Sequence, residues 1–576
     1  MLPTTQWKLP DTDIKAQRLL ENEIGVNSII SQILVNRNIL TPDDANKFLH
    51  PSLKDLHNPF LMKDIEEGVC RVMQAISSGE RIAVYGDYDA DGITSVAVLV
   101  KFLSRIHSNI TYYIPDRIKE GYGLNKDALD RLKHDGVKLV ITVDCGITDC
   151  DEVEYSRNLG MDTIILDHHE VPEVLPNAVA AINPHRSDCM FPFKHLAGVG
   201  IVFNFLIALR GKLRLIGFWE GKTYPNLKEY LDLVALGTIG DISPLIDENR
   251  IFAKIGLDII TEGKRTGIKA LREKSGLDYN NVNSIDASFK LIPRINAAGR
   301  IGSPHEAVEM LLTEDMSEAS KAALLLDGYN RERQEIERSI LNEILERIEA
   351  KYNRDEIKSI VLASPKWHPG VIGIVASKLV DRYYRPAILI CLKDGMGKGS
   401  GRSIAEFNLY QGLKDRCGDL LMSYGGHRYA AGISIEEKNI ELLSQALDNA
   451  VITELDIADL SPKTMIDAEC HLREIDYDLI LEMEKLAPFG NMNPEPVLYV
   501  KNIAPTFPTT VGNNHLRMRI TENDTNHDCI WFSKGHLLNL ISDSMIDAVF
   551  TPHINNWNGR NTIQLKLKDV SMAGKT

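Results

Sequence analysis

The chain has 576 residues, 44% of them hydrophobic and 25% charged, which is enough for about three or four globular domains. Its 65 Lys and Arg against 80 Asp and Glu give a formal net charge of −15, which excludes a broad basic coat but not an enclosed positive track. There is no apolar run of about 18 residues, no basic-then-apolar leader and no CxxC pair among the eight cysteines. We therefore expect a cytoplasmic protein with no membrane contact, disulfide framework or cysteine-rich zinc site.

The first 76 residues read as a polar helical segment, and the pattern changes at Arg81. From there short apolar runs alternate with helical patterns at 93–106, 125–134 and 149–159. The predicted strands are Ile82–Tyr85, Leu139–Val143, Thr163–Leu166 and Val179–Ile182. This alternation is typical of a parallel sheet covered on both faces by helices.

The first of these strands leads into three aspartates at alternate positions, Asp87, Asp89 and Asp91. Alternate side chains of an extended segment point the same way, so these three carboxylates can converge at the carboxyl edge of the sheet. Converging carboxylates repel one another unless a cation lies between them, and Mg²⁺ or Mn²⁺ is the usual partner. A solvated acidic turn is the alternative interpretation.

The next apolar runs end in the same way. Leu139–Val143 leads to Asp144, Thr163–Leu166 to Asp167, His168 and His169, and Leu233–Ile239 to Asp241. If each run is a strand of one sheet, these side chains meet at one edge, and five of the aspartates with one or two imidazoles are enough for two cations. Two such cations favour hydrolysis of a phosphoester or phosphoanhydride.

Beyond residue 250 the strand signals thin out, and 317–350 predicts one or two long helices with Ile336, Ile340, Ile344 and Ile348 on a packed face. A second α/β unit follows, with a strand at 359–363, a helix at 371–382, a strand at 387–391 and a glycine-rich loop at 397–403. After a break near 488–494, short strands with hairpin signals at 512–514 and 558–559 predict a small β-barrel.

Several segments together resemble one family. They are Tyr85–Ser95, Ile114–Asn125, Thr142–Thr148, Leu166–Glu170, Leu233–Leu245, Pro293–Arg300, Trp367–Ser377 and Gly399–Ser403. In this order they resemble the DHH phosphoesterase superfamily and, within it, the RecJ family of single-strand-specific exonucleases, over nearly the whole chain. The resemblance implies an α/β fold of two lobes, a DHH parallel-sheet domain and a DHHA1-type domain, joined by a long helix and followed by an OB-fold barrel.

The implied domains follow in chain order. They are an N-terminal helical segment packed on the catalytic lobe (1–76), the DHH catalytic domain (77–250), a helical connector (251–350), the DHHA1 nucleic-acid-binding domain (351–455) and the OB-fold domain (456–576).

The resemblance also implies roles for the clustered residues, with two divalent ions, Mn²⁺ or Mg²⁺, as cofactors. The metal ligands would be Asp87, Asp89, Asp91, Asp144, His168 and Asp241, with Asp144 bridging and Asp87 serving the second ion. Asp89, Asp167 and His169 form the catalytic set. In it, Asp167 would orient the imidazole of His168, and His169 would touch the scissile phosphate or the attacking water.

Substrate contacts are implied for a second group. Arg117, Ser400 and Arg402 would hold the 5′-terminal phosphate, and Asn296, Arg300 and His427 would line the cleft between the lobes. Tyr122 either stacks on a base or is a packed turn residue, and His368 is as readily structural as a DNA contact.

The barrel segment 497–576 carries a charge of +2, from eight Lys and Arg against six Asp and Glu. Here His515, Arg517 and Arg560 are the expected DNA contacts, while Trp531 is either core or a stacking surface.

The expected function is a 5′→3′ exonuclease that degrades single-stranded DNA to mononucleotides, in recombination and repair, including mismatch repair. Single-strand-binding protein, a helicase and mismatch-repair factors are expected partners on resemblance alone. Two alternatives stay open: a DHH-type phosphatase or phosphodiesterase acting on small phosphorylated substrates, and a non-catalytic DNA-binding scaffold.

Overall fold

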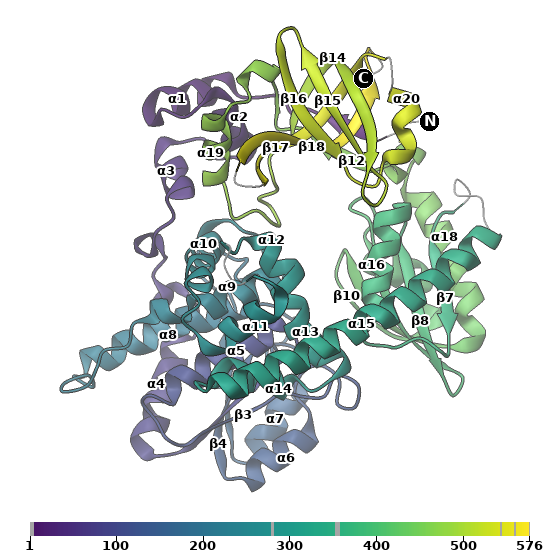
Figure 1. Ribbon diagram of the computed structural model, residues 1–576. Coiled ribbons are helices and arrows are strands. Elements are labelled where there is room, and N and C mark those ends of the chain that lie inside the picture. The colour runs from purple at the N-terminus through teal and green to yellow at the C-terminus, as the bar shows by residue number, and fades with distance from the viewer. Residues whose placement is uncertain (1–4, 278–280, 352–356, 542–543, 558–559, 575–576) are drawn as a thin grey trace. The chain divides into compact units, whose positions relative to one another are not determined.

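The computed structural model describes residues 5–277, 281–351, 357–541, 544–557 and 560–574 (Figure 1). Its contacts divide the chain into two compact units. One unit is Leu56–Leu460, and the other joins Met1–Asp55 to Ser461–Thr576. The larger unit contains both α/β lobes, and the smaller one contains the barrel.

The first lobe is built on a five-stranded sheet in the order β3-β2-β4-β5-β6, with every pairing parallel. The strands are β2 (Arg81–Gly86), β3 (Ile110–Tyr113), β4 (Val137–Val143), β5 (Asp162–Leu166) and β6 (Ala180–Ile182). The predicted parallel sheet is confirmed, because these strands are buried on both faces and read as continuous apolar runs.

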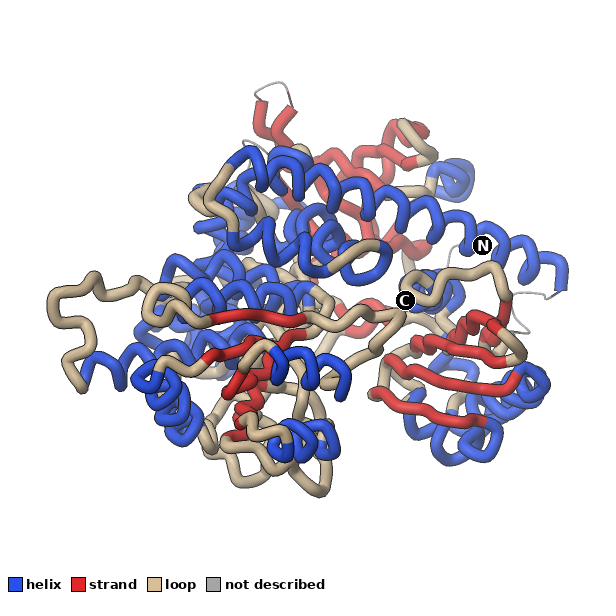
Figure 2. Tube along the Cα trace, turned by 90° about the horizontal axis from the view of Figure 1, so that it is seen from below, coloured by secondary structure: helices blue, strands red, loops and turns tan. Residues whose placement is uncertain are grey.

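Helices connect and cover these strands (Figure 2). They are α4 (Ile65–Ser78), α5 (Ala90–Leu103), α6 (Lys126–His134), α7 (Cys150–Asn158) and α8 (Gly198–Leu215). On one face Leu129 and Val153 from α6 and α7 pack with Ala83 and Val140 from the strands. The carboxyl edge of the sheet therefore stands on a rigid, closely packed layer.

One predicted strand is wrong. Leu233–Ile239 lies inside a helix, α9 (Leu231–Gly240), and is buried throughout. A helix that is apolar on all sides is indistinguishable by pattern from a buried strand, which explains the error. Asp241 therefore reaches the site from the C-terminal end of a helix rather than from a sheet edge.

The described part of the connector consists of helices joined by short loops. Its elements are α10 (Asp247–Glu262), α11 (Thr266–Ser275), α12 (Ser284–Asp286), the π-turn Ala287–Leu291, α13 (Ile292–Ile301), α14 (Pro304–Leu312) and α15 (Met316–Lys351). The 36-residue α15 confirms the predicted long helix, and its Ile340, Ile344 and Ile348 are buried. No helix among the described residues is both long and apolar enough to cross a membrane.

The second lobe has a mixed sheet in the order β10-β11-β9-β8-β7. The strands are β7 (Ile360–Ser364), β8 (Ala387–Lys393), β9 (Met396–Arg402), β10 (Leu421–Gly426) and β11 (Ala430–Glu436). Only β7 and β8 pair in parallel. Helix α16 (Ile372–Tyr383) packs on one face, where Val375 and Leu379 meet Leu389, while α17 (Leu409–Gly412) and α18 (Ile440–Glu454) cover the other.

The smaller unit holds a closed barrel. Its strands are β14 (Leu498–Val511), β15 (His515–Glu522), β16 (Thr525–Trp531), β17 (Ile546–Trp557) and β18 (Arg560–Met572), and a β14–β17 pairing closes the ring. The predicted hairpin at 512–514 is confirmed, with Val511 opposite His515. The second hairpin signal, Asn558-Gly559, lies outside the described residues.

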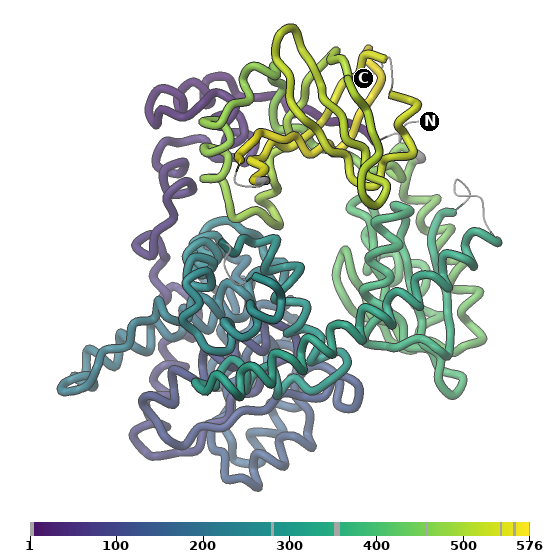
Figure 3. Tube along the Cα trace, in the orientation of Figure 1, coloured from purple at the N-terminus to yellow at the C-terminus, as the bar shows by residue number. Residues whose placement is uncertain are grey.

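The N-terminal helices belong to this barrel unit, whereas residues 56–76 belong to the unit of the catalytic lobe (Figure 3). The packing of residues 1–76 on the catalytic lobe stays a prediction. The helices are α1 (Ile14–Ile24), α2 (Ser28–Asn36) and α3 (Pro42–Leu49), which lie with α19 (Tyr477–Lys485). Ile30 and Leu34 share one core with Leu479 and Leu498. In addition, β1 (Gln6–Lys8) pairs in parallel with β12 (Lys463–Met465). Contacts this distant in sequence leave no local pattern that could reveal them.

Candidate active site

The aspartates after β2 occupy the turn into α5. Asp87 is 5% exposed, and Asp89 caps the helix by accepting from the backbone N–H groups of Asp91 at 2.9 Å and Gly92 at 3.2 Å. Asp91 lies in the first turn of the helix and is fully enclosed. Its two oxygens accept from the N–H groups of Gly198 at 2.7 Å and Val199 at 2.9 Å, at the start of α8. The positive end of that helix stabilises the buried carboxylate.

Asp144, directly after β4, takes a left-handed backbone conformation with φ of 61°. That conformation is uncommon outside glycine. It is held by a hydrogen bond from the Asp144 N–H to the carbonyl of Leu166, 2.9 Å away. Gly198 passes close to the same side chain, so that a Cβ there would lie 2.9 Å from the Asp144 carboxylate. The backbone of α8 therefore confines Asp144.

His168 joins the separate acidic groups. Its Nε2 lies 3.1 Å from Asp144 and 3.9 Å from both Asp91 and Asp241. Three sets of ligand atoms lie within 4.8 Å of one another: Asp87 with Asp89 and Asp144, Asp91 with His168 and Asp241, and Asp144 with His168 and His169. All six predicted metal ligands are thus brought together, in two groups that the third set links through Asp144 and His168.

This donor set fits divalent cations. Among the described residues, Asp87 Oδ1, Asp144 Oδ1 and His168 Nε2 are buried with no hydrogen-bond partner. Burial and the neighbouring carboxylates raise the pKa of both Asp87 and Asp144 well above the ordinary value. Buried polar atoms without partners are costly, and carboxylates this crowded repel, so two hard cations among them would relieve both costs.

Asp167 and His169 form a separate pair, with Oδ1 of Asp167 at 2.7 Å from Nδ1 of His169. Burial opposes ionisation of Asp167, but the hydrogen bond and charge of His169 lower its pKa to about 2. Burial likewise opposes the charged form of His169, whereas Asp167 raises its pKa to about 9. The predicted role of Asp167 is therefore wrong in one detail, because its side chain orients the ring of His169 and not that of His168.

Tyr122 completes this pair. Its hydroxyl donates to the carbonyl oxygen of Asp144 at 3.1 Å and lies 3.1 Å from Nδ1 of His169, while its ring meets His169 edge-on. The side chain is 46% exposed, so one face remains open. Tyr122 thus holds the ring of His169 in place. Because one face of Tyr122 is exposed, stacking of a base on that face stays a prediction.

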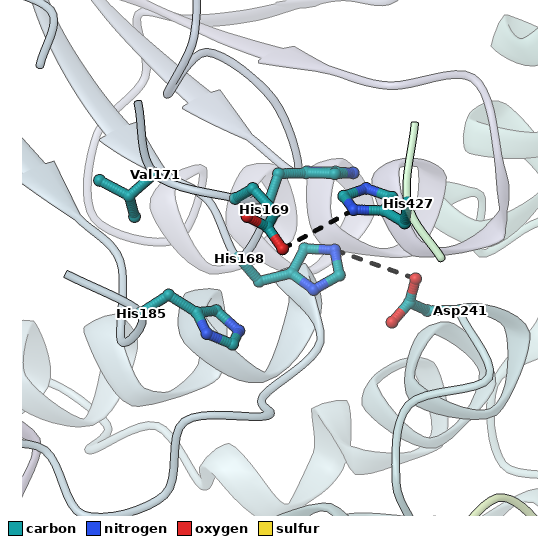
Figure 4. A pocket seen from close by; sticks show the side chains of 7 residues that line it. His168, His169, Val171, His185, Asp241 and His427 are labelled. Carbon is teal, nitrogen blue, oxygen red and sulfur yellow. Dashed lines mark ion pairs between the residues drawn. The ribbon is translucent and has the colours of Figure 1, made fainter. Parts of the chain in front are cut away.

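A pocket of about 530 Å³ opens over these groups (Figure 4). It is lined by His168, His169, Glu170, Val171, His185, Asp241 and His427. His427 follows β10 in the second lobe, and its Nδ1 lies 3.9 Å from Glu170 in the first. The pocket therefore draws on both lobes, as predicted for His427.

Three arginines gather beside the metal-ligating groups. Arg117 lies over the ring of Tyr88, with 4.9 Å from Cζ to the ring centroid. Burial, followed by repulsion from Arg117, lowers the pKa of Arg300 to about 10 and also lowers that of Arg402. The three side chains are therefore near enough to repel one another, and guanidinium groups in this number are suited to bind an anion.

Ser400 and Arg402 lie in strand β9, so the predicted glycine-rich loop is wrong. Both side chains face the start of α16, where a Cβ on Gly373 would lie 2.8 Å from Ser400 Oγ and 3.1 Å from an Arg402 nitrogen. A strand and the first turn of a helix, instead of a loop, form this part of the arginine cluster.

Two predicted cleft residues, Asn296 and Arg300, and the undecided His368 make contacts within the protein. Asn296 accepts from the N–H of Ala90 at 2.8 Å, at the first turn of α5. Arg300 donates to the carbonyl of Gly370 at 3.0 Å, and Nδ1 of His368 accepts from the N–H of Gly370. These hydrogen bonds within the protein account for the positions of the three side chains without a bound substrate.

In the barrel unit, Arg517 is exposed on β15, 3.5 Å from Asp528, and Arg560 is exposed at the start of β18. Trp531 is 2% exposed and belongs to the core, which decides between its two interpretations. Nδ1 of His515 accepts from the N–H of Ser533, and its ring meets that of Phe532.

Sequence reasoning missed His185 and Glu170 as pocket residues. His185 follows β6 by three residues, through Asn183 and Pro184. The rule that ligands bind at the carboxyl ends of parallel strands, applied to this last strand as to the others, would have found it.

Known protein families match each part of the chain. The DHH family N-terminal domain matches residues 81–238, the DHHA1 domain 356–453 and the RecJ OB domain 466–569. The single-stranded-DNA-specific exonuclease RecJ of Bacillus subtilis is 39% identical over 573 residues, which cover 99% of this chain and 71% of that protein. This chain belongs to the RecJ family. The RecJ of Escherichia coli is 38% identical over 470 residues, covering 80% of this chain and 81% of that one.

Solved RecJ structures agree. The Thermus thermophilus RecJ in complex with Mn²⁺ superposes with a TM-score of 0.84 at 28% identity, covering 98% of this chain and 79% of that chain. The same protein in complex with Mg²⁺ gives a TM-score of 0.79 at 27% identity, with coverages of 99% and 79%. The two-lobe α/β fold with a C-terminal barrel is therefore confirmed as that of the RecJ family.

Proposed function

We propose that this RecJ-family chain is a metal-dependent 5′→3′ exonuclease that degrades single-stranded DNA to mononucleotides. One observation carries the proposal: six metal-ligating side chains gather in overlapping clusters, in the same unit of the fold as Arg117, Arg300 and Arg402. Metal ions held by these side chains can activate water to attack a phosphodiester, and the arginines can hold a phosphate group.

Asp87, Asp89, Asp91, Asp144, His168 and Asp241 would hold two divalent ions, Mn²⁺ or Mg²⁺. Bound there, the ions would lower the pKa of water and stabilise the charge that develops on the attacking and leaving oxygens. Backbone N–H groups keep Asp89 and Asp91 in place, so the ligands are preorganised.

His169 would act on the substrate itself. With Nδ1 held by Asp167 and a pKa near 9, the imidazole carries a proton at neutral pH. Its Nε2 can then donate to the scissile phosphate or to the leaving oxygen. Tyr122 holds the ring in this orientation.

Arg117, Arg402 and Ser400 would bind the terminal 5′-phosphate. A site for a terminal phosphate beside the metal-ligating groups selects the end of a strand and not its interior, which gives the 5′→3′ polarity. In the barrel unit, Arg517 and Arg560 would bind the backbone of the strand without sequence preference. The protein would work in the cytoplasm in recombination and repair, including mismatch repair, with single-strand-binding protein, a helicase and mismatch-repair factors as partners.

The test uses a 5′-phosphorylated, 3′-labelled single strand, a matched blunt duplex, and Mn²⁺ or Mg²⁺. We expect mononucleotides to be released progressively from the 5′ end of the single strand, no reaction on the duplex, and complete loss with EDTA. His168→Ala is expected to abolish release while the circular dichroism spectrum stays unchanged. Hydrolysis of small phosphorylated compounds in the absence of any action on DNA would favour the phosphatase alternative instead.

A further inference from the structure

A row of buried polar side chains runs along one face of α15. We call Asp327, Asn330, Arg333 and Glu337 the polar stripe. Their spacing of three, three and four residues places them on one side of the helix. Asp327, Asn330 and Glu337 are 2%, 3% and 5% exposed. Buried carboxylates are costly unless they are paired, so the partners of these two acids show what the stripe holds.

Asp327 holds the first lobe. Its Oδ1 accepts from Nε of Arg294 at 3.0 Å and lies 2.9 Å from Nη2 of the same guanidinium. Arg294 belongs to α13, two residues before Asn296. Arg331, one turn further along α15, neutralises the other oxygen at 2.6 Å. Asp327 thus fixes α13 on the long helix through a two-pronged contact.

Helix α13 leads directly to the metal-ligating residues. Asn296 accepts from the N–H of Ala90, which lies between Asp89 and Asp91. On the same helix Gly299 packs so tightly that a Cβ would lie 2.1 Å from the carbonyl oxygen of Tyr88. Two contacts on α13, Arg294 with Asp327 and Asn296 with Ala90, therefore link Asp327 to the backbone that carries the metal ligands.

Glu337 holds the second lobe. One oxygen pairs with Lys378 of α16, and the other lies 2.5 Å from Arg333 of the stripe, whose guanidinium also donates to Asn330. The start of α16 faces Ser400 and Arg402 through Gly373. Glu337 is thus connected through α16 to Ser400 and Arg402, the two substrate-binding candidates of β9, in the way that Asp327 is connected to the metal-ligating groups.

The two anchor points lie ten residues apart on one continuous helix, or about 15 Å along its axis. An α-helix is stiff over this length because each turn is hydrogen-bonded to the next. The distance from the metal-ligating groups to Ser400 and Arg402 therefore depends on how each side is held to this helix. The polar stripe holds both sides, and Ile340, Ile344 and Ile348 pack against α16 as well.

We propose that Asp327 and Glu337 are positioning residues that set which phosphodiester bond, counted from the 5′ end, is hydrolysed. This proposal rests on the proposed exonuclease function. With the stripe intact, a phosphate held by the arginines places the first internucleotide bond at the metal-ligating groups, and the product is one nucleotide long. When Asp327 or Glu337 loses its partner, the distance between the phosphate-binding residues and the metal-ligating groups is no longer fixed. The bound 5′-phosphate then no longer determines which bond is hydrolysed, and longer products appear.

The test compares Glu337→Gln, Lys378→Gln and the double variant with the wild-type protein. Glu335→Gln is the matched control, since Glu335 is an exposed acid on the same helix. Two readouts are measured with Mn²⁺: the ratio of kcat/KM on 5′-phosphorylated over 5′-hydroxyl strands, and the product length in single turnover. Misfolding lowers activity on both strands equally and leaves the ratio unchanged.

We expect both single variants to reduce the phosphate preference by about fivefold or more and to release dinucleotides beside mononucleotides, with the double variant no worse than either, as for two residues acting as one pair. Lys378 is 50% exposed, so its variant tests the proposal even where Glu337→Gln fails to fold. An unchanged ratio and unchanged products in Lys378→Gln, with an active wild-type protein, would overturn the proposal. Failure of the wild-type protein to act from a 5′ end would overturn the proposed function itself.

Discussion

Oδ1 of Asp167 lies 2.7 Å from Nδ1 of His169, and the carboxylate is enclosed while the imidazole is one-third exposed. The buried partner therefore orients a histidine that faces solvent and substrate. Only Nδ1 of His169 pairs with Asp167, while Nε2 lies 3.3 Å from the hydroxyl of Tyr122.

Asp167→Asn tests this pairing. The amide preserves the shape but removes the charge that holds His169 protonated, so we expect kcat to fall by about a hundredfold or more. The pH profile is expected to change as well, with activity lost at a lower pH than in the wild-type protein. Steady-state hydrolysis of a labelled single strand measures both. Asp151→Asn, an exposed acid at the start of α7, serves as the control, and an effect of equal size there would contradict the assignment.

Gly198→Ala tests the confinement of Asp144. The added Cβ would lie 2.9 Å from the Asp144 side chain, so Asp144 must shift. We expect a loss of activity of about tenfold or more, because small displacements of catalytic groups are costly, together with weaker Mn²⁺ binding in calorimetric titration. Gly211→Ala in the same helix has open space around its Cβ and is the matched control. Equal activity in the two variants would show that Asp144 tolerates the shift.

Arg517→Ala combined with Arg560→Ala tests the barrel. If each residue contacts one phosphate, the slope of log Kobs against log salt for a single strand falls by about 1.4. Fluorescence anisotropy at several salt concentrations measures it, with kcat on a short strand expected to stay the same. Lys15→Ala with Arg18→Ala, on the exposed side of α1, makes the same change in charge. A slope that falls equally in this control would assign the effect to net charge alone.

His553 predicts a pH dependence of stability. Burial, and then repulsion from Lys566, lowers its pKa from 6.5 to about 4. A lowered histidine pKa means that protonation favours the unfolded chain, so stability is complete above pH 6.5 and declines as the pH falls towards 4. We expect His553→Gln to remove about 1 to 2 kcal/mol of the destabilisation between pH 7 and pH 5. Urea unfolding at the two pH values measures it, and parallel losses in both proteins would refute the assignment.

Most of the first lobe could be predicted from the sequence, because its buried strands are continuous apolar runs that end in aspartates. Five of the six expected metal ligands follow such strands, while Asp241 reaches the same site from the end of helix α9. The failures have physical causes. Helix α9 is buried on all sides and so has no periodicity. The strand β9 is rich in glycine and resembles a loop, and which histidine Asp167 contacts depends on side-chain rotamers that no spacing rule specifies.

The core that Ile30 and Leu34 share with Leu479 and Leu498 has a consequence for how the chain is made. At about 5–20 residues per second, roughly 400 residues and about 20 to 80 seconds of synthesis separate the first half of that core from the second. During that interval α1, α2 and α3 can pack only on one another, and the apolar side chains that later meet α19 and the barrel stay exposed. Completion of this core therefore has to wait until the C-terminal part of the unit has been synthesised.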